Sequence, residues 1–177
     1  EPGAWGGIHI CGKAHTNAEG GKGSSEIGGA VYGGNDDADN SGTLQYIRLE
    51  YTGFAFDEEH EANGISFYGV GSGTIVDHCE AYKGSDDGFE FFGGSVNVSN
   101  MVVVSCSDDS FDWTEGWNGK GTDLVAYQEA KATLGYDCDC LIEADNNEND
   151  NAATPVSHPV LKNLILAGNG ESKQGIR

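Results

Sequence analysis

The chain has 177 residues, enough for one domain, and its 29 acidic and 9 basic residues give a formal net charge of −20. This charge excludes nucleic acid as a partner and disfavours anionic membrane surfaces, because binding to either needs a basic face. No apolar run approaches the roughly 18 residues of a membrane-spanning helix, so we expect no direct membrane insertion. The 28 glycines, against 3 prolines, indicate many tight turns.

One apolar spacing recurs along the chain: an apolar residue, two residues, an apolar residue, one residue and an apolar residue. Four such segments in one chain indicate a structural repeat. Their apolar positions, in chain order, are Leu44, Ile47 and Leu49; Val76, Cys79 and Ala81; Val98, Met101 and Val103; and Leu161, Leu164 and Leu166.

Three shorter segments, 63–67, 87–91 and 109–113, alternate apolar residues with others. A period of two is that of a β-strand, in which every second side chain points to the same face. The side chains expected to face a core are those of Ile65, Phe67, Phe89, Phe91, Phe111 and Trp113.

The two kinds of segment recur together. SDDGFEFFGG (85–94) is followed 22 residues later by SDDSFDWTEG (107–116), and the strands before these motifs align as well. A coil of about 22 residues cannot bury its apolar side alone, but stacked coils share a continuous core. The sequence therefore predicts an all-β fold, a parallel β-helix or β-solenoid, as a single unit over residues 1–177.

Two segments depart from the period and are expected to be loops. Residues 54–62 form a short insertion, and residues 126–157 form a long acidic one. Insertions in a solenoid leave from the turns, and binding function concentrates in such loops.

The segments WGGIHICGKA, YGGNDDADNSGTLQYIRLEYTG, NGISFYGVGSGTIVDH, SDDGFEFFGGSVN and DDSFDWTEGWNGKG resemble a family of secreted, lipoprotein-like bacterial surface proteins found in Bacteroidetes and marine bacteria. The resemblance covers residues 5 to about 125 and about 154 to 177. It implies a right-handed parallel β-helix, export to the cell surface and further coils before and after this segment. It implies no catalytic residue, because the family has no established activity.

The doubled aspartates stack carboxylates on successive coils. Coils lie about 4.8 Å apart, and two carboxylates at that distance repel by roughly 1 kcal/mol in water and about 3 to 4 kcal/mol at an effective dielectric constant of 20. Three arrangements relieve the repulsion: bonds to water or turn amides, a bound Ca²⁺, or a raised pKa that makes one carboxyl a general acid. The stacked residues are Asp86, Asp87 and Glu90 over Asp108, Asp109 and Asp112.

A second possible metal site lies in DDADNSG (36–42). Asp37 and Asp39 have the spacing of the first half of a calcium loop, but the glutamate that an EF-hand requires would fall at Arg48. A complete EF-hand is excluded. A partial site completed by another strand and an Asx-rich turn both remain as interpretations.

Aromatic and polar side chains supply the remaining candidates. Phe92, Trp117 and Tyr68 lie outside the inward positions, so we expect them to be exposed and able to bind a sugar. A column beside the inward positions predicts a hydrogen-bonded ladder at a bend. That column contains Tyr46, His78, Asn100 and Asn163.

The five cysteines include no zinc-type Cys-x-x-Cys pair. Cys79 falls on a core position, where a buried free thiol is one interpretation. A disulfide through Cys138 or Cys140 would suit an oxidising compartment, but spacing does not assign the pairing.

Two functions fit these features. The first is an extracellular or cell-surface scaffold, stabilised by Ca²⁺, for adhesion, fibre or surface assembly, or glycan binding, with self-association through the solenoid ends. The second is a Ca²⁺-dependent lyase or hydrolase acting on an acidic polysaccharide, which the acidic face would repel unless the metal bridged them. Its candidate catalytic residues are Asp87, Asp109, Asp112 and Lys83. We favour the scaffold, because Lys83 does not repeat in register with the carboxylates.

Overall fold

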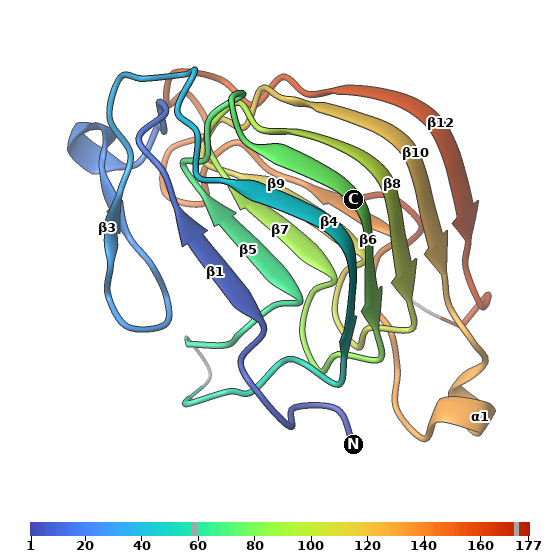
Figure 1. Cartoon of the computed structure of the whole chain (residues 1–177). Coiled ribbons are helices and arrows are strands. Elements are labelled where there is room, and N and C mark those ends of the chain that lie inside the picture. The colour runs from blue at the N-terminus through green and yellow to red at the C-terminus, as the bar shows by residue number, and fades with distance from the viewer. Residues whose placement is uncertain (58–59, 172–173) are drawn as a thin grey trace.

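The computed structural model describes residues 1–57, 60–171 and 174–177, and it consists of two five-stranded sheets and a small hairpin. The sheets form two sides of a solenoid around a shared core (Figure 1). All neighbouring strands within the two sheets are parallel. The first sheet contains β1 (Ile8–Cys11), β5 (Ile65–Tyr68), β7 (Phe89–Phe92), β9 (Phe111–Thr114) and β11 (Ile142–Ala144).

The second sheet is built from longer strands of eight residues each. They are β4 (Thr43–Glu50), β6 (Ile75–Tyr82), β8 (Asn97–Val104), β10 (Lys120–Tyr127) and β12 (Val160–Ala167). The chain alternates between the two sheets, which makes the fold a parallel β-helix, as predicted.

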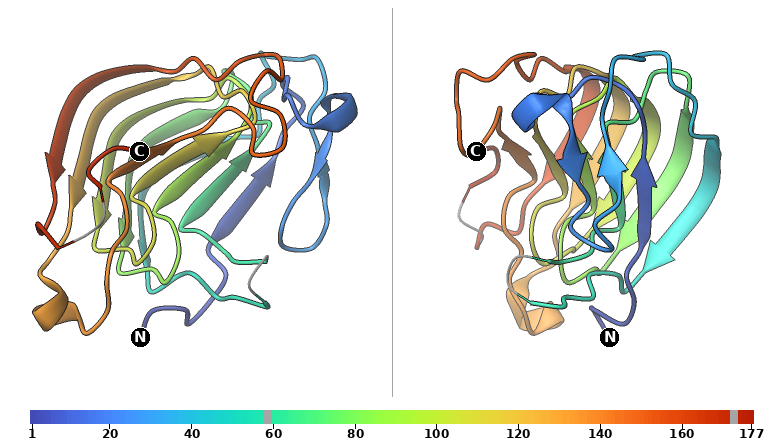
Figure 2. Two further views of the ribbon diagram at one scale, coloured as in Figure 1. Left: turned by 180° about the vertical axis from the view of Figure 1, so that it is seen from behind. Right: turned by 90° about the vertical axis from the view of Figure 1, so that its left-hand side faces the viewer.

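Helical structure is limited to two short elements in the described residues, a 3-10 turn η1 (Glu19–Gly21) and α1 (Lys131–Leu134). Neither is long or apolar enough to cross a membrane. An antiparallel hairpin of β2 (Gly23–Ser24) and β3 (Val31–Tyr32) lies outside the first sheet, beside β1 (Figure 2).

The predicted repeat sets the register. Phe89 on β7 pairs with Phe111 on β9, and Val76 on β6 pairs with Val98 on β8. The six inward aromatic and aliphatic residues predicted on the short strands are all buried, and the Phe67 and Phe91 rings stack with their centroids 5.0 Å apart. Period-two alternation in stacked strands therefore builds the core.

Each long strand bends at its fourth residue, which has a positive φ. Positive φ is uncommon outside glycine, but asparagine and aspartate tolerate it best. We call this set the bend column: Tyr46, His78, Asn100, Asp123 and Asn163, with φ between 52° and 57°. The predicted bend is confirmed, and the predicted hydrogen-bonded ladder is confirmed only in part. Asn163 Nδ2 donates to Asp123 Oδ1 (2.9 Å), and the Tyr46 ring stacks on His78.

Three strands of the two five-stranded sheets have no counterpart in the sequence prediction: β1, β10 and β11. The hairpin strands β2 and β3 were not predicted either. In β10 the first and last apolar positions are Gly121 and Ala126, which hide the spacing, and the Leu161 side chain fills the space above Gly121. β11 lies inside 126–157, so this segment returns to the first sheet before it leaves again. The shorter insertion, 54–62, contains residues 58–59, which lie outside the described residues.

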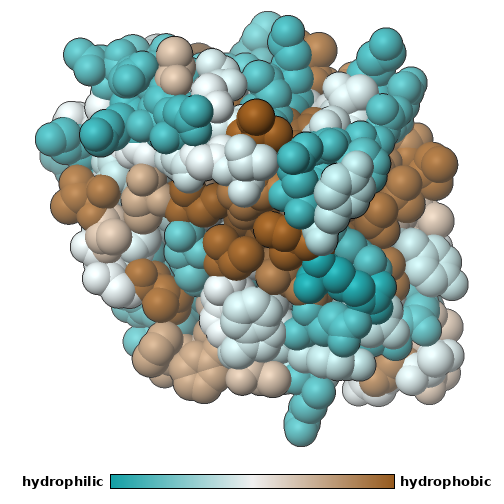
Figure 3. Space-filling view, viewed as in Figure 1, coloured by the Kyte–Doolittle hydropathy of each residue, from teal (hydrophilic) through white to brown (hydrophobic). Residues whose placement is uncertain are grey.

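The two ends of the stack keep part of their apolar surface. Ile8, Ile10 and Ile47 at one end and Leu161 and Leu166 at the other are only partly buried against the core. Figure 3 shows hydrophobic atoms gathered in the middle of the face that β1 and β4 border in Figure 1.

All five cysteines are free, and Cys79 is buried at its predicted core position. Cys138 and Cys140 are buried near the acidic turns and Cys11 alone is exposed. No disulfide links them.

Candidate functional site: an acidic face on the first sheet

Carboxylates line the outer side of the first sheet. Glu90 pairs in register with Asp112, and Asp112 pairs with Glu143, so that three acidic side chains stack on β7, β9 and β11. We call these three residues the acidic column. The Asp86–Asp87 and Asp108–Asp109 doublets lie in the turns that lead into β7 and β9.

The second aspartate of each doublet bonds to the next coil. The Asp109 N–H donates to Asp87 Oδ1 (2.8 Å), and the Cys140 N–H donates to Asp109 Oδ1 (2.5 Å). One oxygen of Asp87 and one of Asp109 are therefore satisfied by turn amides, which was one of the three expected arrangements.

The acidic column is partly buried and has few donors. Asn63 Nδ2 donates to Glu90 Oε2 (2.5 Å) and to Ser66 Oγ (3.0 Å). Asp112 Oδ1 is buried and has no amide or alcohol donor. A buried acceptor without a donor costs about 1–3 kcal/mol or more for a charged group. Either a proton on a neighbouring carboxyl or a cation can satisfy this oxygen.

Burial makes the ionised form of this site unfavourable. It raises the pKa of Asp109 to about 9 and that of Asp112 to about 7, and the Glu143 carboxylate adds to both rises. Burial, and then the charges of nearby carboxylates, also raises the pKa of Asp87 and of Glu90 well above their usual ranges. Several of these groups therefore hold protons near neutral pH unless a cation replaces them.

One carboxylate of the face behaves in the opposite way. The pKa of Glu143 is lowered, because it accepts a hydrogen bond from Asp109 and pairs with Arg177. Asp109 and Glu143 are thus a hydrogen-bonded pair in which the pKa of Asp109 is raised and that of Glu143 is lowered.

Two hollows open over these residues. One, of about 200 Å³, is lined by Glu26, Glu61, Asp86, Asp87, Glu90, Asp108, Asp109, Asp112 and Glu143. The other, of about 340 Å³, shares part of this lining and extends to residues of the 126–157 segment, namely Asp145, Asn147, Glu148 and Asn149.

The carboxylates predicted to bind metal form two compact sets. Ligand atoms of Asp86, Asp87 and Asp108 lie within 4.8 Å of one another, and so do those of Asp87, Glu90 and Asp112. Asp87 belongs to both. Burial, with Glu61 and Asp108 adding to the effect, raises the pKa of Asp86 to about 8.

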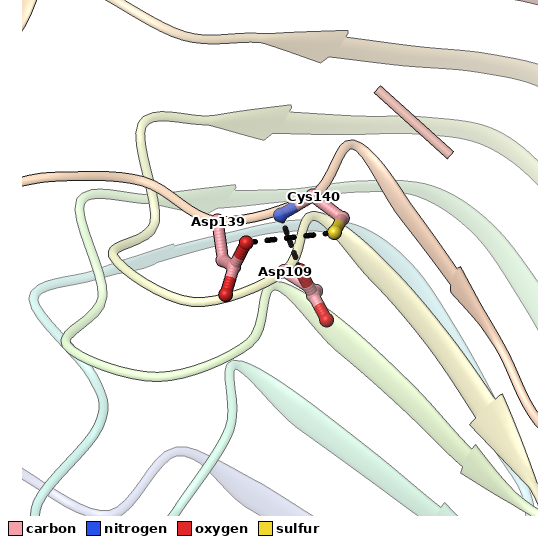
Figure 4. Close-up of side chains that lie close together, drawn as sticks. All are labelled: Asp109, Asp139 and Cys140. Atoms are coloured by element: carbon pink, nitrogen blue, oxygen red, sulfur yellow. Dashed lines mark hydrogen bonds between the residues drawn. The ribbon is translucent and has the colours of Figure 1, made fainter. Parts of the chain in front are cut away.

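A third set was not predicted. Asp109, Asp139 and Cys140 lie close together at the start of β11, where the Cys140 thiol donates to Asp139 Oδ1 at 3.5 Å (Figure 4). Cys140 is buried, and burial raises the pKa of its thiol to about 12, so it is a poor thiolate donor. We assign this set no role.

Asp37 and Asp39 do not join the acidic face. Asp37 accepts a hydrogen bond from the His15 N–H (3.0 Å), and Asp39 Oδ2 accepts one from Ser41 Oγ (2.9 Å). Neither belongs to a group of three metal-ligating side chains in the described residues. These contacts agree with the Asx-rich turn and give no support to a partial calcium loop.

Lys83, the candidate base, does not line either acidic hollow. Its ammonium pairs with Glu129 (2.7 Å) and lies over the Tyr82 ring. Within the described residues, the basic side chain that pairs with the acidic column is instead Arg177, bound to Glu143. The sequence did not indicate it, because it lies far from the aspartate motifs.

The expectation that Tyr68 and Phe92 are exposed is wrong. Both point outward from the first sheet, as their place in the alternation requires, but Tyr32 of the hairpin covers them. The Tyr68 and Phe92 rings stack with centroids 4.4 Å apart, and Tyr68 is 0% exposed. A loop that folds back onto the sheet cannot be read from the strand pattern.

Trp117 is also buried, at 1% exposure, where exposure was expected. Its ring stacks on Phe91 with centroids 4.1 Å apart, and its Nε1 donates to the Val96 carbonyl (3.2 Å). The turn after β9 thus inserts its indole into the solenoid core. None of the three aromatic candidates forms an exposed sugar platform.

Comparison with known proteins agrees with the fold. The model of the family described as the pectate-lyase-like β-helix domain matches residues 1–177. No curated protein and no solved structure matches the chain. The protein belongs to the pectate-lyase-like β-helix domain family, because the family model matches the whole chain and the two parallel sheets form a solenoid.

Proposed function

We propose that the protein is a β-helix scaffold of the cell surface or extracellular space, stabilised by a divalent cation such as Ca²⁺ on its acidic face. In this role it serves adhesion, surface or fibre assembly, or glycan binding. The proposal rests on one observation: Asp112 Oδ1 is buried without an amide or alcohol donor, while ligand atoms of Asp87 and Glu90 lie within 4.8 Å of its own.

The donor set favours a hard cation. The set of Asp87, Glu90 and Asp112 offers carboxylate oxygens, and so does the adjacent set that shares Asp87. Ca²⁺ takes six to eight oxygen ligands from carboxylates, carbonyls and water. The half-open hollow above the sets leaves room for water to complete the coordination.

Cation binding is tested by unfolding and calorimetry. Protein passed over a chelating resin is titrated with CaCl₂ and with MgCl₂, and its Tm is measured at each step. At a Ca²⁺ concentration of 100 times Kd, binding adds about 2.7 kcal/mol, a rise in Tm of about 5–10 °C for a domain of this size.

The matched variants are Asp112→Asn and Asp150→Asn. Asp150 is exposed and accepts a hydrogen bond from the Ala152 N–H, which asparagine also accepts. We expect Asp112→Asn to weaken Ca²⁺ binding by about tenfold or more and Asp150→Asn to leave it unchanged. A Tm that does not respond to Ca²⁺ in the unsubstituted protein contradicts the proposal.

A second function has its own support. Asp109 with a raised pKa beside Glu143 with a lowered pKa is the arrangement of a general acid next to an ionised partner. This pair favours a polysaccharide lyase or glycoside hydrolase as the alternative. Turnover of a uronic-acid polymer that disappears in Asp109→Asn, with Tm retained, would replace the scaffold proposal.

Self-association belongs to the scaffold proposal. The partly buried Ile8, Ile10 and Ile47 at one end and Leu161 and Leu166 at the other give it apolar contact surface. Because the net charge of −20 opposes association, we expect any assembly to require Ca²⁺ or high salt. Sedimentation velocity with and without Ca²⁺ measures this, and a monomer under all conditions contradicts it.

A further inference from the structure

A hollow of about 680 Å³ lies at the edge of the first sheet, next to the hairpin. Three segments meet there: the chain after β1, the turn η1 and the chain after β3. The lining residues are Cys11, Gly12, Lys13, Gly20, Gly21, Lys22, Val31, Gly33, Gly34, Asn35 and Asp36.

Glycines allow the three segments to approach closely. A Cβ on Gly33, whose φ is +91°, would lie 2.7 Å from the Gly21 carbonyl oxygen, and one on Gly34 would lie 2.8 Å from the Lys13 carbonyl oxygen. The Asp36 N–H also donates to the Lys13 carbonyl (2.9 Å). These contacts hold the backbones of the two lysines on opposite sides of one hollow.

The lysines of this hollow lack the ion pairs that four basic side chains of the described residues form. Arg48, Lys83, Lys131 and Arg177 each pair with a carboxylate. Within the described residues, Lys13 and Lys22 have no ion pair. Both lysines are exposed and line the same hollow, in a chain with a net charge of −20.

The charge balance of the hollow is positive. Asp36 is its one carboxylate, and Asp36 Oδ1 accepts a hydrogen bond from the Ala38 N–H (3.2 Å). Asn35 adds a neutral amide. The acidic face lies on the other side of the hairpin, where Glu26 lines both acidic hollows.

From this geometry we infer that Lys13 and Lys22 form an anion-binding site. Its ligand is an oxyanion, either a free sulfate-like ion or the carboxylate or sulfate group of an acidic saccharide. Two lysines that line one open hollow supply positive charges for such a group, and Asn35 supplies further donors. This site needs no metal and is independent of the cation proposed for the acidic face.

Cys11 provides a reporter inside the site. It lines the hollow and is the one exposed cysteine, while the other four are buried. Its alkylation by anionic iodoacetate and by neutral iodoacetamide therefore measures the local charge. One unit charge about 6 Å away in water changes a local anion concentration roughly threefold. We expect the rate with iodoacetate divided by the rate with iodoacetamide to fall about threefold or more in Lys13→Gln/Lys22→Gln.

The control is Lys120→Gln/Lys162→Gln. Lys120 on β10 and Lys162 on β12 also have no ion pair in the described part of the chain, but they lie on the second sheet. This double variant has the same net charge as the first. We expect its ratio of the two rates to stay within a factor of about 1.5 of that of the unsubstituted protein, because distant charges are screened by salt.

Ligand binding is measured by calorimetry on resin-treated protein at low salt, with sodium sulfate and with a tri-uronic acid as probes. We expect the tri-uronic acid, the sulfate or both to bind, and Lys13→Gln/Lys22→Gln to weaken binding about tenfold. Tighter binding of the tri-uronic acid assigns the site to a saccharide, and equal binding assigns it to a free ion. No binding of either probe, or equal losses in the two double variants, overturns the inference. Neither outcome bears on the Ca²⁺ titration.

Discussion

Two columns of side chains cross the solenoid. In both, each side chain stacks on the side chain at the same position of the next coil, but the residue types differ. At the bend column of the second sheet, neighbours are complementary: Asn163 Nδ2 donates to Asp123 Oδ1 within the column (2.9 Å). Asn100 Nδ2 (2.8 Å) and His78 (2.8 Å) both bond to Asp77, the residue before His78 on β6. Bonds from Asn100, His78 and Ser99 hold the pKa of Asp77 far below its usual range. In the acidic column, carboxyl groups stack on carboxyl groups, and the pKa of Glu90 and of Asp112 is raised.

The difference shows what stacking does in a β-helix. Each position is repeated on the next coil at about 4.8 Å, so a complementary pair is satisfied within the protein and a like-charged pair is not. The bend column is complete by itself. The acidic column needs protons or a cation from outside, which is why it marks the candidate site.

The largest expected effect is a pH dependence of the cation-free protein. The raised pKa values of Asp109 (about 9), Asp86 (about 8) and Asp112 (about 7) mean that the folded state holds these protons more tightly than the unfolded chain. Their contribution to stability is fully present below about pH 4 and is lost as pH rises toward 9. We expect the free energy of unfolding to fall by about 3–5 kcal/mol between pH 5 and pH 9.

Urea unfolding across this pH range, with and without Ca²⁺, measures the effect. Saturating Ca²⁺ should flatten the curve, because the cation stabilises the ionised carboxylates. Cation-free protein that is more stable at pH 9 than at pH 5 would show that these carboxylates are not repelling one another.

A smaller effect is expected when the acidic column is made neutral. In Glu90→Gln/Asp112→Asn the stacked charges are replaced by amides that can donate as well as accept. At pH 8 and without cation, we expect the variant to be more stable by about 1–3 kcal/mol, because repulsion is removed. Its Tm should also stop responding to Ca²⁺. A less stable variant would show that the column is already satisfied by protons.

In the bend column, substitution should destabilise the protein. Asn100→Ala removes the bond to Asp77 and forces alanine into a positive φ of 54°, for a combined loss of about 1–2 kcal/mol. Asn100→Gly keeps the backbone conformation and should lose less. Thermal unfolding of both variants separates backbone strain from the lost hydrogen bond, and equal losses would mean that the strain is negligible.

The smallest effect is expected for Asp77→Asn, because the Asp77 side chain is only partly buried and solvent screens its bonds. Its lowered pKa contributes stability above the ordinary pKa of about 3.9, and this contribution is lost as pH falls through the lowered pKa of the folded state. The variant should therefore have a slightly lower Tm at pH 7, and the difference should shrink only well below the ordinary pKa. A Tm at pH 7 equal to that of the unsubstituted protein would show that the bonds to Asp77 do not stabilise the fold.

The sequence predicts the coils well where they keep the 22-residue spacing. It places Asp87 below Asp109, because the alternation around Phe89 and Phe111 sets the register of two neighbouring strands. Glu143 was missed, because the insertion before β11 breaks the spacing although Glu143 pairs with Asp112 as the repeat requires.

The errors concern segments that fold back onto the solenoid. Tyr68 and Phe92 have the outward positions that alternation gives them, but burial depends on Tyr32, which comes from an insertion with no strand repeat. The Lys13 and Lys22 hollow was missed for the same reason. Its walls come from segments brought together by tertiary contacts of glycine backbone, which leave no periodic signal.

The segments around the hairpin have a mechanical consequence. Thr16 Oγ1 (2.7 Å) and Tyr32 OH (2.8 Å) both donate to Glu115 Oε2, and Asn17 Nδ2 donates to the Asn146 carbonyl (3.0 Å). The segment between β1 and β4 is therefore tied to the turns after β9 and β11. A pulling force on the N-terminal end loads these bonds across several coils at once. We therefore expect the solenoid to resist unwinding from this end and to extend under force in one large step rather than coil by coil.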